Sequence, residues 1–254
     1  MTAHEPFATG RSLLHRLDPR AKLASATVYS VAVAVVTDLQ VLTLALAFSA
    51  ILLASARLNG RRLAWRLAAI NGFLAFLWLF LPWSVAGQAV ARWGPVTVTH
   101  EGLQLALQIT LRCNAIVWAS IALLGTSRTV DLVRALHDLR LPAKFVLMLH
   151  FCVCYVGLIQ SEYRRLMDAA RIRGFKPGGN LHTYRTYGNL AGTLLVRCHD
   201  RGVRIYEAML CRGFNGRFPR LAGKRLAPRD VLAAAVIIMY TLLLVGIEWT
   251  LKAR

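Results

Sequence analysis

Long stretches without any charged side chain are the feature that most constrains this chain. They occupy residues 23–37, 39–56, 67–91, 113–127, 145–161 and 231–247. Apolar runs that approach 18–20 residues are long enough to cross a bilayer as helices. Only 17% of the residues are charged, against about 25% in a typical soluble domain. The pattern predicts an all-α, polytopic membrane protein, and we expect no cleavable signal peptide.

The charges that the chain does carry are strongly basic, with a formal net charge of +19. This balance fits either a nucleic-acid-binding surface or the cytoplasmic loops of a membrane protein, where Lys and Arg accumulate. The apolar runs favour the membrane protein. Residues 161–229 hold fifteen Lys and Arg against four Asp and Glu, a net charge of +11. We therefore expect this segment in the cytoplasm.

The N-terminal part of the chain is predicted to form a membrane bundle. Asp18 and Pro19 suit the cap and first turn of its first helix. Basic residues before that helix and in the loop 57–66 place both ends of the first hairpin in the cytoplasm. Arg112 is costly in lipid, so it should face protein. The predicted spans are 23–37, 39–56, 67–82 and 103–125.

The loop 83–101 is expected outside the cytoplasm. It holds one Arg and no Lys, and its two tryptophans are typical of a membrane interface. Its segment Thr97–Thr99 has the composition of extended backbone.

The later part of the chain contains a parity conflict. Residues 128–140 form an amphipathic pattern and 143–160 are apolar again. A full crossing at 143–160 would place the basic segment outside, so we predict a helix packed low against the bundle that runs into 161–174. A final span follows at 230–249.

These assignments give a helical bundle of about five spans, with six as the alternative. They divide the chain into an N-terminal membrane bundle, a cytoplasmic helical region and a C-terminal transmembrane helix, at 1–127, 128–229 and 230–254.

The basic segment repeats itself. A shift of 39 positions aligns RLMDAARIRGF at 165–175 with RIYEAMLCRGF at 204–214. Ala169 and Ala208 lie four residues before the second arginine of each copy, on nearly the same helix face. Small residues there leave room for the surface of a partner.

Each copy has the pattern of a capped helix end. Gly174 and Gly213 can adopt the left-handed conformation that closes a helix. Arg173 and Arg212 suit the negative end of the helix dipole and present planar forks that fit a carboxylate. One such end would be ordinary, but two in the same register predict two similar tips that dock onto two similar pockets.

The five cysteines, Cys113, Cys152, Cys154, Cys198 and Cys211, have no framework spacing. His150, Cys152 and Cys154 suggest a metal cluster, but residues two apart on a helix point to different faces. We therefore predict no metal site.

The repeated motif, Ile172-Arg173-Gly174 and Cys211-Arg212-Gly213, resembles the signature of the transmembrane T components of energy-coupling factor (ECF) transporters. The stretch from His15 to Lys22 is similar to the N-terminal stretch of the cobalt-type family, CbiQ. The resemblance covers nearly the whole chain.

The resemblance implies a coupling subunit in the plasma membrane of a prokaryote. It implies that the two motif helices cross and dock into two ABC ATPase subunits of the CbiO type, where the arginines meet acidic residues. It also implies a CbiM-like substrate-binding S component, with a small CbiN-like subunit. Cobalt is the implied substrate, with nickel or a vitamin such as biotin as alternatives. On this basis residues 128–229 are a coupling region.

Two other classes stay open at the level of sequence. A membrane-embedded enzyme acting on lipids would use His137, Asp138, His150 or the pair His199-Asp200. A nucleic-acid-binding membrane protein would use the basic segment, which lacks the interleaved aromatics of a single-strand platform. The chain has no phosphate-binding G-x-x-x-x-G-K-[ST] loop, so we expect no cofactor of its own and ATP use only by partner subunits.

Overall fold

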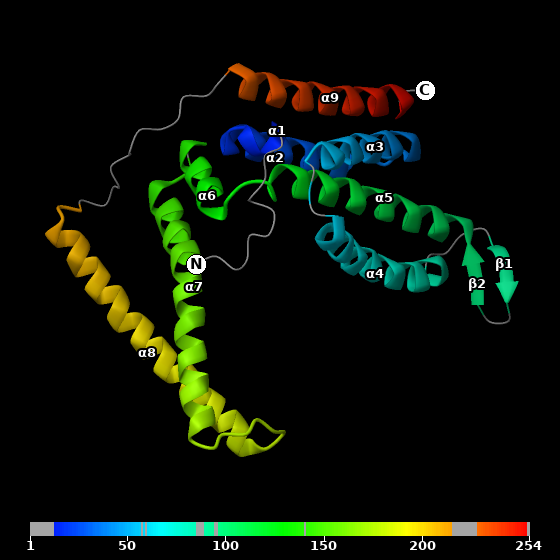
Figure 1. Cartoon of the computed structure of the whole chain (residues 1–254). Helices are drawn as coiled ribbons and strands as arrows, with labels where there is room; N and C mark the ends of the chain where they lie inside the picture. The colour runs from blue at the N-terminus through cyan, green and yellow to red at the C-terminus, as the bar shows by residue number, and fades with distance from the viewer. Residues whose placement is uncertain are drawn as a thin grey trace. The chain divides into compact units, whose positions relative to one another are not determined.

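The computed structural model describes residues 13–56, 58, 60–84, 89–93, 96–139, 141–214 and 228–252. Helices dominate the described residues (Figure 1), which confirms the all-α prediction. The elements in chain order are α1 (Leu13–Arg16), α2 (Pro19–Val35), α3 (Leu39–Ser55), α4 (Gly60–Ser84), β1 (Ala89–Trp93), β2 (Val96–Thr99), α5 (His100–Leu123), α6 (Thr129–Asp138), α7 (Ala143–Ile172), α8 (Leu181–Cys211) and α9 (Pro228–Lys252).

A short antiparallel hairpin interrupts the helices between α4 and α5. In this hairpin β1 pairs with β2, and Trp93 lies opposite Val96. The extended backbone predicted at 97–99 is therefore confirmed, while its partner strand at 89–93 was not predicted.

The described residues separate into two compact units. The first, which we call the membrane unit, contains residues 13–135 and 228–252. The second, the crossed-helix unit, contains residues 136–214. The chain thus leaves the membrane unit, builds the crossed-helix unit and returns to the membrane unit with α9.

Four helices are long and apolar enough to cross a membrane. They are α4, α5, α7 and α9, and α3 is a shorter apolar helix. The helices α2 to α5 and α9 coincide with the predicted spans. Because α7 also meets this criterion, the parity argument that keeps residues 143–160 from crossing stays a prediction.

The start of α4 differs from the sequence prediction. Residues 57–66 were expected to form a loop, but α4 begins at Gly60 and includes Arg61 and Arg66. Arg and Leu are good helix formers, so the apolar helix of the span extends back through the basic residues.

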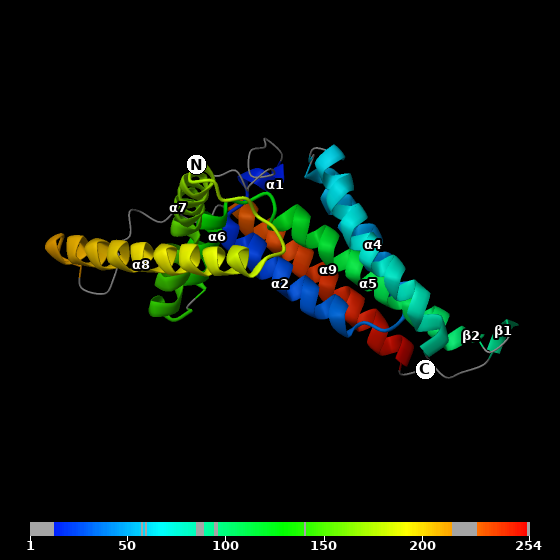
Figure 2. The same ribbon diagram turned by 90° about the horizontal axis from the view of Figure 1, so that it is seen from below.

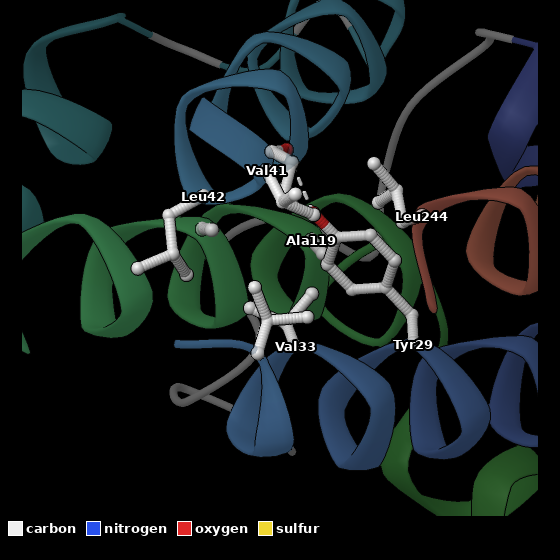
Figure 3. Close-up of a cluster of buried hydrophobic side chains, with 9 residues drawn as sticks. Tyr29, Val33, Val41, Leu42, Ala119 and Leu244 are labelled. Atoms are coloured by element: carbon white, nitrogen blue, oxygen red, sulfur yellow. Dashed lines mark hydrogen bonds between the residues drawn. The ribbon is translucent and has the colours of Figure 1, made fainter. Parts of the chain in front are cut away.

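The core of the membrane unit lies between α2, α3, α5 and α9 (Figure 3). Tyr29 and Val33 of α2 face Leu42 of α3, Ala119 of α5 and Leu244 of α9, and all five are buried. Alanines on α5 let the helix backbones approach closely. The buried hydroxyl of Tyr29 donates to the carbonyl of Ala45 over 2.7 Å, so its polar group is satisfied inside the core.

Polar contacts hold the N-terminal end of α2. The carboxylate of Asp18 accepts from the backbone N–H of Arg20 over 2.9 Å with Pro19 at the first turn, which confirms the predicted cap. Lys22 is only 2% exposed. Its ammonium donates to the hydroxyls of Thr126 (3.2 Å) and Ser127 (2.9 Å), just after α5. The N-terminus of α2 is thereby tied to the end of α5.

A second set of polar contacts closes the turn between α2 and α3. Arg112 of α5 donates to the carbonyl of Val36, so it faces protein as predicted. Glu248 of α9 accepts from the backbone N–H and the hydroxyl of Thr37, over 2.8 and 3.0 Å. Lys252 lies 2.9 Å from the same carboxylate oxygen. These contacts fix α9 against the first hairpin.

Candidate docking interface on two helix tips

The two arginine-glycine motifs close α7 and α8 in the same way. Gly174 has a φ of 84° and Gly213 a φ of 78°, both in the left-handed region. The backbone N–H of each glycine donates to the carbonyl three residues earlier, which is that of Arg171 for Gly174 (3.0 Å) and that of Leu210 for Gly213 (2.9 Å). The predicted glycine caps are therefore confirmed.

The phenylalanine after each glycine completes the same motif. The backbone N–H of Phe175 donates to the carbonyl of Ala170 over 3.1 Å, and that of Phe214 to Met209 over 3.0 Å. Both sets of bonds are the pair that defines a Schellman cap. The sequence repeat is thus a structural repeat, and each copy places its arginine at the equivalent position of the helix end.

All eight predicted docking residues are exposed. Ile172 is the most unusual of them, since 87% of this large apolar side chain is accessible to solvent. Exposed apolar side chains gathered with charges at one place mark contact surfaces. The exposed set is Ala169, Ile172, Arg173, Gly174, Ala208, Cys211, Arg212 and Gly213.

The two guanidinium groups are free to meet a partner. Among the described residues, neither Arg173 nor Arg212 makes a side-chain hydrogen bond or an ion pair. The carboxylate of Asp168 is close to the first tip, but it pairs with Arg171 at 3.8 Å and not with Arg173.

The two helices cross within the crossed-helix unit (Figures 1 and 2). At the contact, Arg197 of α8 donates to the carboxylate of Glu162 on α7 over 2.7 Å. Arg165 lies 3.7 Å from the same carboxylate. The side chain of Glu162 is 15% exposed and that of Arg197 is 53% exposed, so the ion pair lies at the edge of the helix contact and is open to solvent on the arginine side.

The connection between the helices is also ordered by specific contacts. The ring of Phe175 packs edge-on against Tyr187, with ring centres 5.6 Å apart. The backbone N–H of Gly178 donates to the hydroxyl of Thr183 over 3.2 Å. These contacts turn the chain back so that α8 runs away from the first tip.

The tips consequently lie at different ends of the crossed pair (Figure 1). The helix α8 has 31 residues, which at a rise of 1.5 Å per residue is about 45 Å of helix between its start, near Gly174, and the second tip. Two similar tips that far apart can engage two separate pockets.

An apolar groove of about 450 Å³ accompanies the crossing. Tyr155 and Ile159 of α7 and Ile205 of α8 are among its lining residues, and Glu162 and Arg197 lie in its wall. Sequence reasoning missed Glu162, Arg197 and the groove, because a pair 35 positions apart carries no local pattern.

The residues weighed for an enzymatic site do not form a cluster in the described part of the chain. His199 and Asp200 are exposed on α8, and the side chain of His137 lies outside the described residues. No group of three or more His, Cys, Asp or Glu side chains suited to a metal was found among the described residues. The structure does bring Cys154 to 3.7 Å from His150.

Comparison with known proteins finds one family and several related transport proteins that match most of the chain. The CbiQ family, described as "Cobalt transport protein", matches residues 10–221. The chain is 26% identical to the "energy-coupling factor transporter transmembrane protein EcfT" of Leuconostoc gelidum, covering 93% of each protein. It is 20% identical to the EcfT of Ruminiclostridium cellulolyticum, covering 96% of each.

A third relative is named for nickel, whereas the description of the matching family names cobalt. The chain is 29% identical to the "nickel permease LarQ" of Lactiplantibacillus plantarum over 152 residues, which are 60% of this chain. The match spans about half of LarQ, 52% of its length. The chain is a multi-pass membrane protein and belongs to the CbiQ family, which confirms its resemblance to the T components of ECF transporters.

Proposed function

We propose that this chain couples two ATPase subunits to a substrate-binding S component in an ABC-type importer of the plasma membrane. The observation that carries the proposal is the pair of identically capped, exposed tips, each ending in an arginine with no partner among the described residues. The crossed-helix unit would be cytoplasmic and would receive the motion, and the membrane unit would lie in the bilayer.

Each tip is suited to insertion into an acidic pocket. The guanidinium of Arg173 or Arg212 offers two parallel hydrogen bonds to a carboxylate. The exposed Ile172 and Cys211 would add apolar contact, and Ala169 and Ala208 would let the wall of the pocket come close. The arginines therefore position the subunits, and the helix caps hold the arginines.

Motion would pass from one tip to the other through the helix crossing. When ATP binding closes the ATPase dimer, the two docked tips move with their subunits. Because α7 and α8 contact each other at Glu162 and Arg197, a motion of one tip relative to the other would change the angle of the crossing. That change would reach the S component in contact with the helices. ATP is bound and hydrolysed by the partner subunits, and we assign no catalytic residue to this chain.

The proposed substrate is cobalt ion, supported by the description of the matching family. Nickel is the second candidate, because a relative is named a nickel permease, and a vitamin is the third. For the metal ions the partners would be CbiO-like ATPases and a CbiM-like S component with a CbiN-like subunit. Uptake of each substrate by cells that express the complete set of subunits distinguishes the three.

Charge reversal at both tips tests the docking model. The variant Arg173→Glu plus Arg212→Glu places a carboxylate against each acidic pocket, so we expect loss of co-purification with the ATPases and loss of uptake. Breaking one buried charge pair at an interface costs about 2–5 kcal/mol. The measurement is the amount of ATPase retained by the purified membrane subunit.

The matched control is Arg164→Glu plus Arg204→Glu. These arginines are exposed on the same two helices, two turns before the tips, and the change in net charge is the same. The control should assemble and transport normally. Normal assembly of the tip variant, or equal loss in the control, would overturn the docking model.

A further inference from the structure

His150 and Cys154 lie together on one face of α7. They are four residues apart, the spacing that brings side chains on successive helical turns into contact. Cys154 Sγ lies 3.7 Å from His150 Nε2. Cys154 is exposed and His150 is half-buried, so no other described element covers this face of the pair.

The distance between the two atoms fits joint ligation of one metal ion. Zinc binds His nitrogen at about 2.0–2.1 Å and Cys sulfur at about 2.3 Å, and a tetrahedral angle between those bonds separates the two atoms by about 3.5 Å. A change of about 0.2 Å from the observed distance lies within side-chain motion in a helix. The two donors are therefore already close to the geometry that a shared ion requires.

The donor set selects a class of ion. An imidazole nitrogen with a thiolate suits zinc, cobalt and nickel, whereas magnesium and calcium prefer oxygen ligands. The described residues supply no third His, Cys, Asp or Glu to this pair. The remaining positions of the ion would thus be open to water or to an external ligand, which makes the ion exchangeable.

We propose that His150 and Cys154 form a two-ligand site for a divalent transition-metal ion of the cobalt, nickel and zinc class. The ion takes the place of the thiol proton, which is released to solvent. Binding consequently tightens as the pH rises. This site does not depend on the docking of the helix tips or on the identity of the transported substrate.

Cysteine placement on the same helix provides a matched control. Cys152 is also exposed on α7 and is only two residues away. It lines the groove beside α8, whereas Cys154 does not. A substitution at Cys152 therefore removes a thiol from the same helix without removing the proposed ligand.

The test is titration of the purified full-length chain in detergent, without a histidine tag and under a non-thiol reductant, with cobalt(II) alone. We expect the near-ultraviolet absorption band of a thiolate–cobalt bond in the wild type and in Cys152→Ser. The band should be lost in Cys154→Ser, and its midpoint should move to higher cobalt concentration in His150→Gln. Size-exclusion profiles and helical circular dichroism identify any variant that fails to fold, and for such a variant Cys154→Ala or His150→Ala is used instead.

The outcomes separate the proposal from ordinary thiol binding. Retention of the band in a folded Cys154 variant, or equal loss in Cys152→Ser, would overturn it. An unchanged midpoint in the His150 variants would also overturn it, because a lone thiol would then explain the band. The variant Arg173→Glu plus Arg212→Glu should keep the band, so failure of the docking model and failure of the metal site are distinguishable.

Discussion

At the scale of single residues, the two glycine caps fix where the arginines point. Gly174 and Gly213 adopt positive φ, and an added Cβ would meet no atom within 4 Å at either position. Substitution there is therefore a test of backbone conformation alone. The arginine is the residue immediately before, so a change in the cap redirects it without altering its charge.

We predict that Gly174→Ala plus Gly213→Ala weakens ATPase binding less than charge reversal does. A side chain in the left-handed region costs about 1–2 kcal/mol per residue, which favours a frayed helix end and a misplaced guanidinium. Replacement by Asn should retain more binding, because Asn tolerates that conformation. Retention of ATPase on the purified subunit is the measurement.

The control for the cap variants is Gly178→Ala. Gly178 lies in the same connection, has open space around its Cβ position and does not have a positive φ. It should bind as the wild type does. If the alanine and asparagine cap variants bound equally well, positive φ would not be what positions the arginines.

Local sequence predicted the caps but not the polar pairs. A glycine cap can be recognised from the local sequence alone, because it is a Gly that directly follows a helical run. Lys22 reaches Thr126 and Ser127 across more than one hundred positions, so its burial has no local signal. The 3.7 Å contact between His150 and Cys154 was not predicted, although residues four apart on a helix are neighbours, because the prediction considered only the i, i+2 spacing of the two cysteines.

At the scale of secondary-structure elements, the crossing of α7 and α8 contains one ion pair between the two helices. Glu162 accepts from Arg197 across the two helices, and most other contacts in the groove are apolar. Apolar contacts allow several crossing registers, whereas an ion pair with a short hydrogen bond selects one.

We predict that Glu162→Gln loosens the crossing without unfolding either helix. The neutral amide loses the charge-assisted bond to Arg197 but keeps the size of the side chain. Amide hydrogen exchange should therefore rise in the middle of α8, and transport should fall more than ATPase binding does. Arg197→Gln should give the same pattern.

The double variant shows whether the two residues act as a pair. If they do, Glu162→Gln plus Arg197→Gln has about the effect of one substitution. Additive effects would mean that each residue contributes through other contacts, and the crossing would then rest on the apolar groove.

Helix existence was predicted well and helix boundaries less well. The uncharged runs overlap each of the long apolar helices among the described residues, because hydrophobic length is read directly from the sequence. The start of α4 at Gly60 was missed, since charged residues were equated with a loop although Arg61 and Arg66 are good helix formers. The register of α7 on α8 depends on the connection from Arg173 to Asn180, and no periodicity within one helix contains that information.

At the scale of the whole molecule, α9 completes the membrane unit that the first helices begin. Glu248 accepts from Thr37 near one end of α9. Near the middle, the hydroxyl of Tyr240 donates to the carbonyl of Leu44 over 3.0 Å, and its ring stacks on Phe48 at 4.0 Å between centres. The sequence predicted a final span but not that it packs against the first hairpin.

We predict that Lys22→Met destabilises the membrane unit. The substitution removes the ammonium that donates to the hydroxyls of Thr126 and Ser127. The hydroxyl of Thr126 keeps its bonds to the carbonyls of Ala122 and Leu123, so the loss is that of the two bonds from Lys22, and a bond to a charged group contributes about 1.5–3 kcal/mol. The melting temperature of the purified chain should fall. Arg61→Met, a change of the same charge at an exposed position, is the control and should leave the melting temperature unchanged.

Hydrogen exchange also shows which part of the chain Lys22→Met destabilises. Hydrogen exchange should rise at the start of α2 and after α5 in Lys22→Met, while α8 should exchange as in the wild type, because it belongs to the other unit. Equal melting temperatures for Lys22→Met and the wild type would mean that Lys22 contributes no net stability.

The return of α9 to the first hairpin also sets an order of events during synthesis. The ribosome completes α5 and then the entire crossed-helix unit before it reaches Pro228. At about 5–20 residues per second, that interval lasts roughly 5–20 s. Throughout it, the side of α2 and α3 that Leu244 and Tyr240 will cover has no intramolecular cover from α9. A nascent chain of this protein therefore presents an unfinished helix face to the membrane for seconds, and whatever inserts or chaperones it must hold that face until the last helix arrives.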